Sequence, residues 1–332
     1  MHFCNMKQHF AIIGCGKIAQ RHAEQINRVG KLIAVCDIEI SNAELLANQF
    51  NAKSYISVDE MLKCEPTIEI VSVCSPNYLH KVHTILALNA GKDVLCEKPL
   101  AIKVSDAEEM INSAKTNNKK LYVVKSSRYN YCIKKIKELI ENNNLGNIYS
   151  FHLNMVWNRP NSYFQNSWKG TIDKDGGILF TQFSHYVDAL IWLLGEVDSF
   201  TGFRSNRSDK NIESEDSGAI ALKMKSGAIG TIHYTINAFE KNQEISLDLI
   251  AENATIKIGG EFMHQVIYQK PSLISNVENK MNFKLRKSLS NHEDIYDELI
   301  LAINNNPSSL PSAESAIKCI QLIENLYQTI KQ

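Results

Sequence analysis

The sequence predicts an α/β domain with a parallel sheet, followed by an α+β domain with a large, mostly antiparallel open sheet. Up to about residue 125, apolar strand-like runs alternate with amphipathic helix-like stretches, an order typical of right-handed βαβ crossovers. Beyond residue 143, most strand-like segments follow one another directly, as they do in antiparallel sheets. A chain of 332 residues also exceeds the usual size of a single core. We therefore predict two domains, residues 1–125 and residues 126–332.

The strands of the first domain are predicted from short apolar, β-branched runs, the pattern of strands that are covered on both faces. They are expected at 10–13, 32–36, 70–74, 93–96 and 121–124, with helices at 17–28, 41–49, 79–90 and 104–117. In the second domain, strands are expected at 147–157, 197–205, 217–224, 228–236, 245–250 and 254–258. The helices of that domain are expected at 131–143, 178–194, 291–304 and 312–330.

Composition argues against several classes of protein. The chain carries 36 basic and 36 acidic residues, so no net charge attracts nucleic acid or an anionic membrane. No apolar stretch approaches the roughly 18 residues that span a bilayer, and Met1–His9 lacks the apolar core of a signal peptide. The eight cysteines are scattered without a CxxC pair, which predicts reduced thiols and no metal site. We expect a cytoplasmic protein that binds neither nucleic acid nor membrane.

A glycine-rich turn after the first predicted strand indicates a Rossmann dinucleotide-binding domain. The run at 10–13 leads into Gly14-Cys15-Gly16-Lys17-Ile18-Ala19, where Gly14 permits the turn and Gly16 lets a pyrophosphate approach the backbone. The strand at 32–36 ends in Asp37, about twenty residues beyond the glycines, where an acid binds the ribose 2′-hydroxyl and repels a 2′-phosphate. This spacing favours NAD over NADP. The alternative is that Asp37 only caps the next helix of a plain βαβ unit.

Two ionisable side chains are candidates for proton transfer. Lys98, in the segment Glu97-Lys98-Pro99, follows the strand at 93–96, at the sheet edge where doubly wound folds bind ligands. His185 lies in the predicted helix at 178–194, just after a flexible Asp175-Gly176-Gly177 segment. Three other polar residues lie at helical spacings around it: Thr181, Gln182 and Asp188. His185 is either a structural histidine or an acid/base group, and the glycines upstream favour the second role.

A polar and aromatic segment upstream of that helix resembles a lid over a substrate. It contains two cations, Arg159 and Lys169, and three rings, Trp157, Tyr163 and Trp168. Cations suit an anionic substrate, and aromatic rings suit a sugar or a base. The alternative is a surface loop with packing aromatics, and residue types alone favour the two interpretations equally.

Taken together, these motifs resemble those of the Gfo/Idh/MocA oxidoreductase family. The resemblance rests on residues 14–19, on Ser75-Pro76-Asn77 with His80, on Glu97-Lys98-Pro99, and on the glycine turn before His185. It implies a Rossmann domain and a second domain with a large open sheet, with Lys98 and His185 as catalytic residues. The cofactor-binding residues that the motifs and the resemblance indicate are Gly14, Cys15, Gly16, Lys17, Ile18, Asp37, Ser75, Asn77, His80, Glu97 and Lys98.

Finer features are similar to the WlbA/WbpB-like branch of that family, whose enzymes oxidise the 3-hydroxyl of UDP-N-acetylglucosaminuronic acid with NAD. These features lie in the segments 123–130, 168–171 and 182–188. The similarity implies a nucleotide-sugar substrate and a role in making precursors of lipopolysaccharide or other cell-surface polysaccharides. The substrate-binding residues that it implies are Arg159, Tyr163, Trp168, Lys169, Thr181 and Gln182. Two positions differ, because many family members carry Asp in place of Thr181 and the family carries Arg in place of Lys169.

Such an oxidation needs a hydride acceptor, a base for the hydroxyl proton, and donors for the developing carbonyl oxygen. We predict His185 as the base and Lys98 as the group that polarises the oxygen, although either side chain can act as the base. The same motifs also fit a dehydrogenase of a free sugar or inositol, an NAD-dependent glycosidase, or a non-catalytic NAD-sensing regulator. Retention of both Lys98 and His185 argues against the regulator. Consecutive strands leave one face of the second sheet uncovered, which predicts a homodimer or homotetramer.

Overall fold

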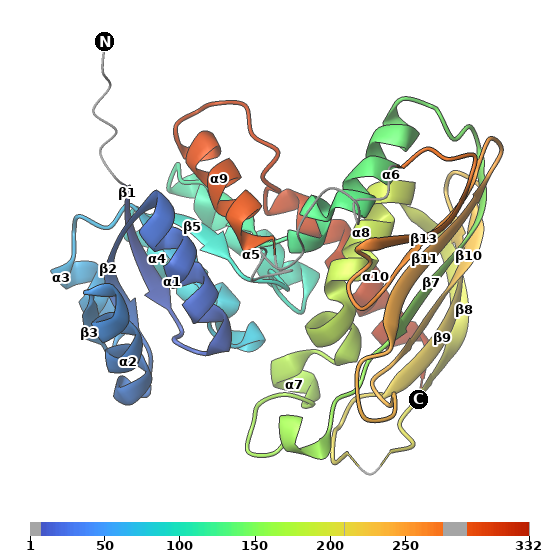
Figure 1. The fold of residues 1–332 in the computed structure, drawn as a ribbon. Helices are drawn as coiled ribbons and strands as arrows, with labels where there is room; N and C mark the ends of the chain where they lie inside the picture. The colour runs from blue at the N-terminus through green and yellow to red at the C-terminus, as the bar shows by residue number, and fades with distance from the viewer. Residues whose placement is uncertain (1–7, 209, 275–290, 332) are drawn as a thin grey trace. The chain divides into compact units, whose positions relative to one another are not determined.

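The computed structural model describes residues 8–208, 210–274 and 291–331 (Figure 1). These residues form two compact units. The first holds the chain up to Lys125 together with His292–Ile320, and the second holds Ser126–Asn291 together with the chain from Gln321 onward. The prediction of one continuous second domain, 126–332, is therefore wrong for residues 292–320. Residues 1–7, part of the segment assessed for a signal peptide, lie outside the described residues.

Within the described residues, the first unit is built around a six-stranded parallel sheet with the order β3-β2-β1-β4-β5-β6. Its strands are β1 (Gln8–Ile13), β2 (Gly30–Cys36), β3 (Lys53–Tyr55), β4 (Ile70–Val73), β5 (Asp93–Cys96) and β6 (Leu121–Val123). The five predicted strands are present, and β3 is an additional edge strand that has no buried residue and hence no apolar signal. The strand order reverses between β1 and β4, and doubly wound sheets bind ligands at such a switch point.

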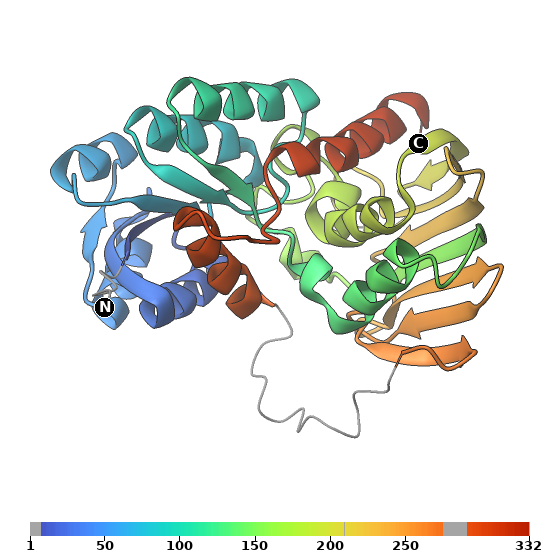
Figure 2. The same ribbon diagram turned by 90° about the horizontal axis from the view of Figure 1, so that it is seen from above.

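Helices cover both faces of this sheet (Figure 2). They are α1 (Lys17–Val29), α2 (Ile40–Phe50), α3 (Val58–Cys64), α4 (His80–Asn89), α5 (Val104–Thr116) and α9 (His292–Ile303). The start of α10 (Glu314–Thr329) also belongs to this unit, and the chain just before it pairs with the edge strand β6 through Tyr122 and Ser312. Helix α9 packs against α1. Its Tyr296 is fully buried, with the hydroxyl 2.8 Å from Ser72 Oγ in β4. This burial of α9 explains why residues 292–320 join the first unit.

In the part of the chain that the structure covers, the second unit contains a seven-stranded sheet with the order β13-β12-β11-β7-β10-β9-β8. Its strands are β7 (Ile148–Val156), β8 (Val197–Ser205), β9 (Ser217–Met224), β10 (Ile229–Thr235), β11 (Glu244–Ala251), β12 (Thr255–Gly259) and β13 (Gln265–Lys270). Neighbouring strands are antiparallel except for β7 and β10, which are parallel. The mixed, mostly antiparallel sheet confirms the predicted fold class. Strand β13 was not predicted, because it too has no buried residue.

Helices of the second unit lie on one face of its sheet (Figure 1). They are α6 (Tyr131–Glu141), α7 (Ile172–Asp175), α8 (Ser184–Leu194) and the end of α10. The other face carries exposed apolar side chains, such as Phe203, which is 82% exposed, and Ile229, which is 59% exposed. The register aligns Phe203 with Ala219, and Ala219 with His233, across three neighbouring strands of this face. This face is the one that we expect a second copy to cover.

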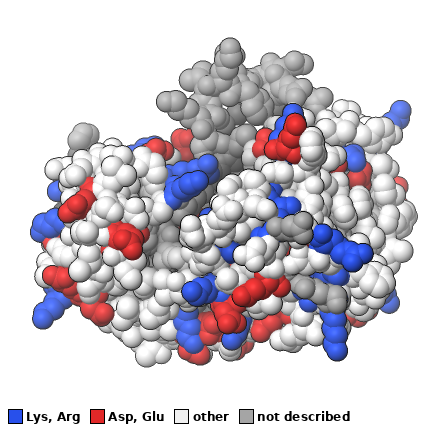
Figure 3. Space-filling model, turned by 90° about the horizontal axis from the view of Figure 1, so that it is seen from below, with Lys and Arg blue, Asp and Glu red and all other residues white. Residues whose placement is uncertain are grey.

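Charge is evenly distributed over the part of the surface that Figure 3 draws. Basic and acidic side chains are interspersed there, in keeping with the totals of 36 each. Mixed charge of this kind gives little long-range attraction for polyanions. Among the described residues, no helix combines the length and the apolar character needed to cross a bilayer.

Candidate active site

The glycine turn joins β1 to α1 at the carboxyl edge of the first sheet. Gly14 has a φ of +90°, and a Cβ there would lie 2.6 Å from the backbone nitrogen of Ser75, so only glycine fits. A Cβ on Gly16 would meet no atom within 4 Å, so the backbone at this position borders open space. Backbone N–H groups at the start of a helix such as α1 bind anions well. The turn therefore fits the pyrophosphate of a dinucleotide.

Asp37 connects the end of β2 to the glycine turn. Its Oδ2 accepts a hydrogen bond from the backbone N–H of Cys15 at 2.7 Å, and its Oδ1 accepts one from the N–H of Glu39 at 2.9 Å. The first bond places the carboxylate beside the turn, and the second orders the approach to α2. Asp37 is not the cap of α2, whose N-cap is Glu39 with no side-chain cap hydrogen bond, so only its contact with the glycine turn has a structural counterpart. Burial, followed by the charge of Asp37, raises the pKa of the Cys15 thiol to about 12, so this thiol is protonated and unreactive.

Ser75, Asn77 and His80 follow β4 and are nearly buried. The His80 ring lies between two carbonyl oxygens, with Nδ1 2.7 Å from that of Pro99 and Nε2 2.8 Å from that of Ser75. A neutral imidazole has only one N–H, so it satisfies one carbonyl, whereas the charged ring satisfies both. Burial lowers the pKa of His80, and the two carbonyls oppose that shift. His80 therefore lies between the turns of Ser75 and Pro99, and in its neutral form it donates to one of the two carbonyl oxygens.

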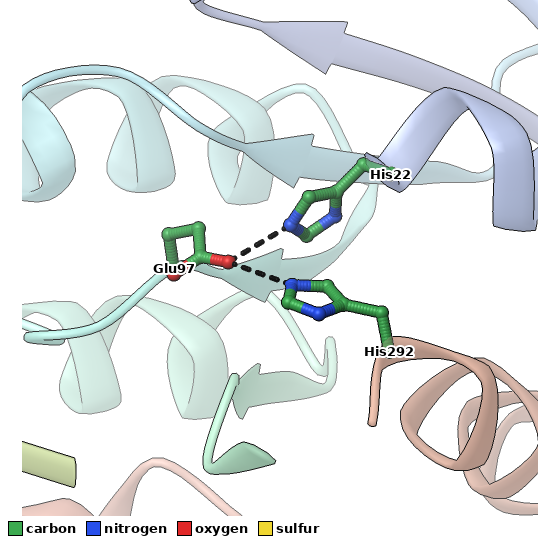
Figure 4. Close-up of side chains that lie close together, drawn as sticks. All are labelled: His22, Glu97 and His292. Atoms are coloured by element: carbon green, nitrogen blue, oxygen red, sulfur yellow. Dashed lines mark hydrogen bonds and ion pairs between the residues drawn. The ribbon is translucent and has the colours of Figure 1, made fainter. Parts of the chain in front are cut away.

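Lys98 lies two residues after the end of β5, at the carboxyl edge of the sheet, and is half-buried. The preceding residue, Glu97, is 6% exposed and meets two imidazoles on one oxygen (Figure 4). Its Oε1 lies 2.9 Å from His22 Nε2 and 3.3 Å from His292 Nε2. Burial alone raises the pKa of Glu97, but the hydrogen bonds from the two histidines outweigh it and hold the pKa well below the ordinary value. Glu97 is therefore an ionised carboxylate.

His22 and His292 are candidate functional residues that the sequence analysis missed. Neither belongs to a short motif with Glu97, and only the packing of α9 on α1 brings the three side chains together. Two imidazoles and a carboxylate are also ligand types of zinc sites, and these ligand atoms lie within 4.8 Å of one another. In the structure the same atoms are joined by hydrogen bonds, which account for their proximity.

In the second unit, three of the predicted substrate-binding residues gather around the ring of a fourth, Tyr163. The guanidinium carbon of Arg159 lies 5.4 Å from the ring centroid of Tyr163, and Lys169 Nζ lies 4.3 Å from it. Gln182 donates from Nε2 to the Tyr163 hydroxyl at 2.9 Å and accepts from Arg159 Nε at 2.6 Å. Two cations on one aromatic ring form a site that favours an anionic ligand.

Arg159 is held in this cluster from several sides. Its guanidinium carbon lies 4.6 Å from the ring centroid of Trp157, and Nη1 donates to Asn242 Oδ1 at 3.0 Å. Asn242 precedes β11 and carries no local signal that could have singled it out. Trp168, also predicted to bind substrate, has its ring centroid 5.9 Å from Lys169 Nζ. The four predicted residues and Trp168 thus belong to one local cluster.

The predicted helix at 178–194 consists of two parts, a π-helical turn (Leu179–Phe183) and α8. The turn is held by side chains from outside it. The hydroxyl of Thr181 donates to the carboxylate of Asp175, which is fully buried and also accepts the N–H of Gly170 at 2.7 Å. The hydroxyl of Tyr327 accepts the N–H of Leu179 at 3.0 Å. Such π-helical turns often occur at functional sites, and helical spacing alone does not reveal them.

His185 lies in the first turn of α8 and is half-buried, and its backbone carbonyl accepts a hydrogen bond from Ser127 Oγ at 2.7 Å. Asp188 forms a two-pronged ion pair with Arg128, with distances of 2.8 and 2.9 Å, and is 1% exposed. Asp188 therefore anchors α8 within its unit. Of the two predicted catalytic residues, Lys98 belongs to the first unit and His185 to the second.

Models of one protein family match both units. The NAD-binding Rossmann fold of the oxidoreductase family Gfo/Idh/MocA matches residues 8–125, and the C-terminal domain of that family matches residues 133–257. The chain belongs to the Gfo/Idh/MocA oxidoreductase family. This confirms the predicted family, the NAD-binding Rossmann domain and the oxidoreductase class.

Individual proteins are also similar to this chain. The chain is 32% identical over 209 residues to a glucose-6-phosphate 3-dehydrogenase of Bacillus subtilis, a match that covers 62% of this chain and only 59% of that protein. The WlbA dehydrogenase of Chromobacterium violaceum, solved with NADH and UDP-GlcNAcA, is 29% identical with a TM-score of 0.90 and covers 98% of this chain and 94% of its own. The WlbA dehydrogenase of Bordetella pertussis, with the same ligands, is 27% identical with a TM-score of 0.87, and the coverage is 97% and 96%.

Proposed function

We propose that this protein oxidises the 3-hydroxyl of UDP-N-acetylglucosaminuronic acid (UDP-GlcNAcA), or of a close uronic relative, with NAD. The observation that carries the proposal is the placement of Arg159 and Lys169 on the ring of Tyr163, since paired cations suit a carboxylate or a diphosphate. The two WlbA structures contain this nucleotide sugar together with NADH. The 3-keto product would serve the biosynthesis of cell-surface polysaccharides such as lipopolysaccharide.

In this reaction NAD supplies the hydride acceptor. His185 takes the proton of the 3-hydroxyl, because an imidazole that is neutral near pH 7 acts as a base. Lys98 donates a hydrogen bond to the oxygen on which negative charge develops as the carbonyl forms. The glycine turn and Asp37 hold the cofactor, with Asp37 on the adenosine ribose.

The two cations of the cluster have different parts in substrate binding. The guanidinium of Arg159 is planar and matches both oxygens of a carboxylate, so we assign it to the uronate group. Lys169 is a compact charge on a flexible stem and is assigned to the diphosphate. Gln182 and Asn242 fix the orientation of the Arg159 fork through their hydrogen bonds to it.

The proposal is tested by NAD reduction with UDP-GlcNAcA, its neutral parent UDP-GlcNAc, and glucose 6-phosphate. Arg159→Ala is expected to raise KM for the uronate more than for the neutral parent, whereas Lys169→Met is expected to raise both KM values alike, because both sugar nucleotides carry the diphosphate. Lys174→Met, at an exposed lysine of α7, is the matched control and is expected to leave both KM values unchanged. The proposal fails if the uronate neither raises the melting temperature nor supports formation of NADH.

The proton-transfer roles are tested in the same assay. Lys98→Met and His185→Ala are each expected to lower kcat by about a hundredfold to ten-thousandfold, the usual contribution of a general acid or base. The dissociation constant for NADH should change little. A variant with near wild-type turnover removes that residue from the mechanism.

A second candidate is the 3-oxidation of a sugar phosphate, which the 32% identity to a glucose-6-phosphate 3-dehydrogenase favours. The same two cations would then bind the phosphate. A higher kcat/KM for glucose 6-phosphate than for the uronate would select this function.

We also propose that the protein is a homodimer or homotetramer that pairs the exposed faces of its seven-stranded sheets. The support is the exposed apolar surface around Phe203 and Ile229, since an isologous interface buries such a face on both copies.

A further inference from the structure

Glu97 connects two distant histidines to the backbone of Lys98. Its Oε1 lies 2.9 Å from His22 Nε2 in α1 and 3.3 Å from His292 Nε2 at the start of α9 (Figure 4). Its Oε2 accepts a hydrogen bond from the backbone N–H of Lys98 at 3.0 Å. One oxygen of the carboxylate is thus held by two helices, and the other holds the residue to which we assign a catalytic role.

The direction of each hydrogen bond follows from the ionised state of Glu97. A carboxylate only accepts, so Nε2 of both histidines must donate to it. Burial lowers the pKa of His22 despite the opposing effect of Glu97, so this ring is neutral and its Nδ1 accepts. The hydroxyl of Tyr296, 2.8 Å from Nδ1, donates to it and in turn accepts from Ser72 Oγ at 2.8 Å. The donors and acceptors form a consistent chain from β4 to Glu97.

The other side of Lys98 is held as well. The carbonyl oxygen of the next residue, Pro99, lies 2.7 Å from His80 Nδ1, and the His80 ring is 1% exposed. The backbone on both sides of Lys98 therefore contacts a buried histidine or a carboxylate that buried histidines hold. A fixed backbone holds a catalytic side chain at the reacting atom. This matters because a small displacement of that side chain lowers the reaction rate strongly.

We propose that His292 is a positioning residue for Lys98 that acts through Glu97. The proposal rests on the proposed function, because it takes Lys98 as a catalytic residue. A buried carboxylate with too few donors shifts toward water or takes up a proton. The donor that α9 delivers keeps Glu97 ionised and directed at the N–H of Lys98. A helix near the end of the chain thereby fixes the geometry of the turn after β5.

Three variants test this role. His292→Leu removes the donor, whereas His292→Gln keeps an N–H group in its place. Leu299→Ala is the matched control, because Leu299 is fully buried in the same helix and belongs to no part of the Glu97 network. We expect His292→Leu to lower kcat for NAD reduction about tenfold, the scale of one hydrogen bond to a charged group, while the dissociation constant for NADH stays within about twofold of wild type. His292→Gln should recover most of the loss, and Leu299→Ala should lower the melting temperature without this fall in kcat.

A second readout needs no substrate. The Lys98 amine is acetylated with acetic anhydride, and the rate of acetylation is measured from the mass of the peptide that contains Lys98. We expect this rate to be several-fold higher in His292→Leu than in wild type and unchanged in Leu299→Ala. The proposal is overturned if His292→Leu and Leu299→Ala change kcat and the rate of Lys98 acetylation alike. It is also overturned if His292→Leu changes neither quantity. It is also overturned if the purified protein holds stoichiometric zinc whose removal lowers the melting temperature, because the three side chains would then form a metal site.

Lys98→Met separates this proposal from the proposed function. If Lys98→Met turns over like the wild type, the catalytic role of Lys98 fails. If Lys98→Met is inactive while His292→Leu is normal, only the positioning role of His292 fails.

Discussion

Replacement of Thr181 tests the hydrogen bonds that hold the turn before the helix of His185. Asp175 is fully buried, and its two oxygens accept from the Thr181 hydroxyl and from the N–H of Gly170 at 2.7 Å. Thr181→Val keeps the shape of the side chain and removes the donor. A buried acceptor that loses its donor costs about 1–3 kcal/mol, with charged groups at the upper end. We therefore expect Thr181→Val to lower the free energy of unfolding by about 2–3 kcal/mol.

Thr181→Asp introduces the residue that many members of the family carry at this position. In this chain the new carboxylate would contact that of Asp175, and two carboxylates in one buried site cannot both ionise. The pKa of one of the two carboxyls must therefore rise. At a pH above the raised pKa, each unit of that rise lowers the free energy of unfolding by about 1.4 kcal/mol. The expected loss at pH 7 therefore exceeds that of Thr181→Val. It should shrink at pH 5, where one carboxyl takes up a proton.

Urea unfolding, followed by tryptophan fluorescence at pH 7 and pH 5, measures both effects. Thr181→Ser keeps the hydroxyl and is the matched control, expected within about 1 kcal/mol of wild type. Two results would contradict this role of the Thr181 hydroxyl. One is a Thr181→Val variant as stable as the wild type, and the other is a Thr181→Asp variant whose loss of stability is the same at both pH values.

Three further predictions concern the cofactor, pH and assembly. Asp37→Ala should relax the preference for NAD over NADP by about 1–3 kcal/mol in fluorescence titrations, and equal affinity of the wild type for both cofactors would contradict the role of Asp37. Burial lowers the pKa of His83 to about 4 and also lowers that of His22. Both stay neutral in the folded protein while the unfolded chain binds their protons below about pH 6.5, so the free energy of unfolding should fall as pH drops from about 6.5 toward 4. Urea unfolding at pH 7 and pH 5 measures this fall, and His83→Gln should reduce it. Phe203→Glu should dissociate the assembly in light scattering, whereas a monomeric wild type at micromolar concentration would contradict the assembly itself.

The first sheet could be predicted because a parallel strand that is buried on both faces is a continuous apolar run. The strand Ile70–Val73, buried at every position, is the clearest case. Strands β3 and β13 were not predicted because neither contains a buried residue, so the hydrophobic pattern of the sequence does not indicate them. The predicted boundary placed α9 in the second domain. The structure places it in the first unit, because Tyr296 of α9 is buried against a sheet whose strands come from the N-terminal part of the chain.

The parts of the site that local motifs encode could be predicted in the same way. The glycine turn and Lys98 belong to such motifs, since a turn or a strand end needs particular residues next to one another. His292 lies 195 residues from Glu97, and no local pattern joins them. The link from Asp175 to Thr181 spans only six residues. This hydrogen bond was not predicted, because the helical spacing of the sequence predicts a regular helix there, whereas the chain forms a π-helical turn.

In the proposed function, a hydride passes from C3 of a uronic sugar nucleotide to NAD. The most direct measurement uses UDP-GlcNAcA that carries deuterium at C3, with the protein and NAD, and records the mass of the reduced cofactor. We expect NADH that is heavier by one deuterium, formed in equal amount to a 3-keto sugar nucleotide. Unlabelled NADH, or release of a free sugar with no net NADH, would contradict it.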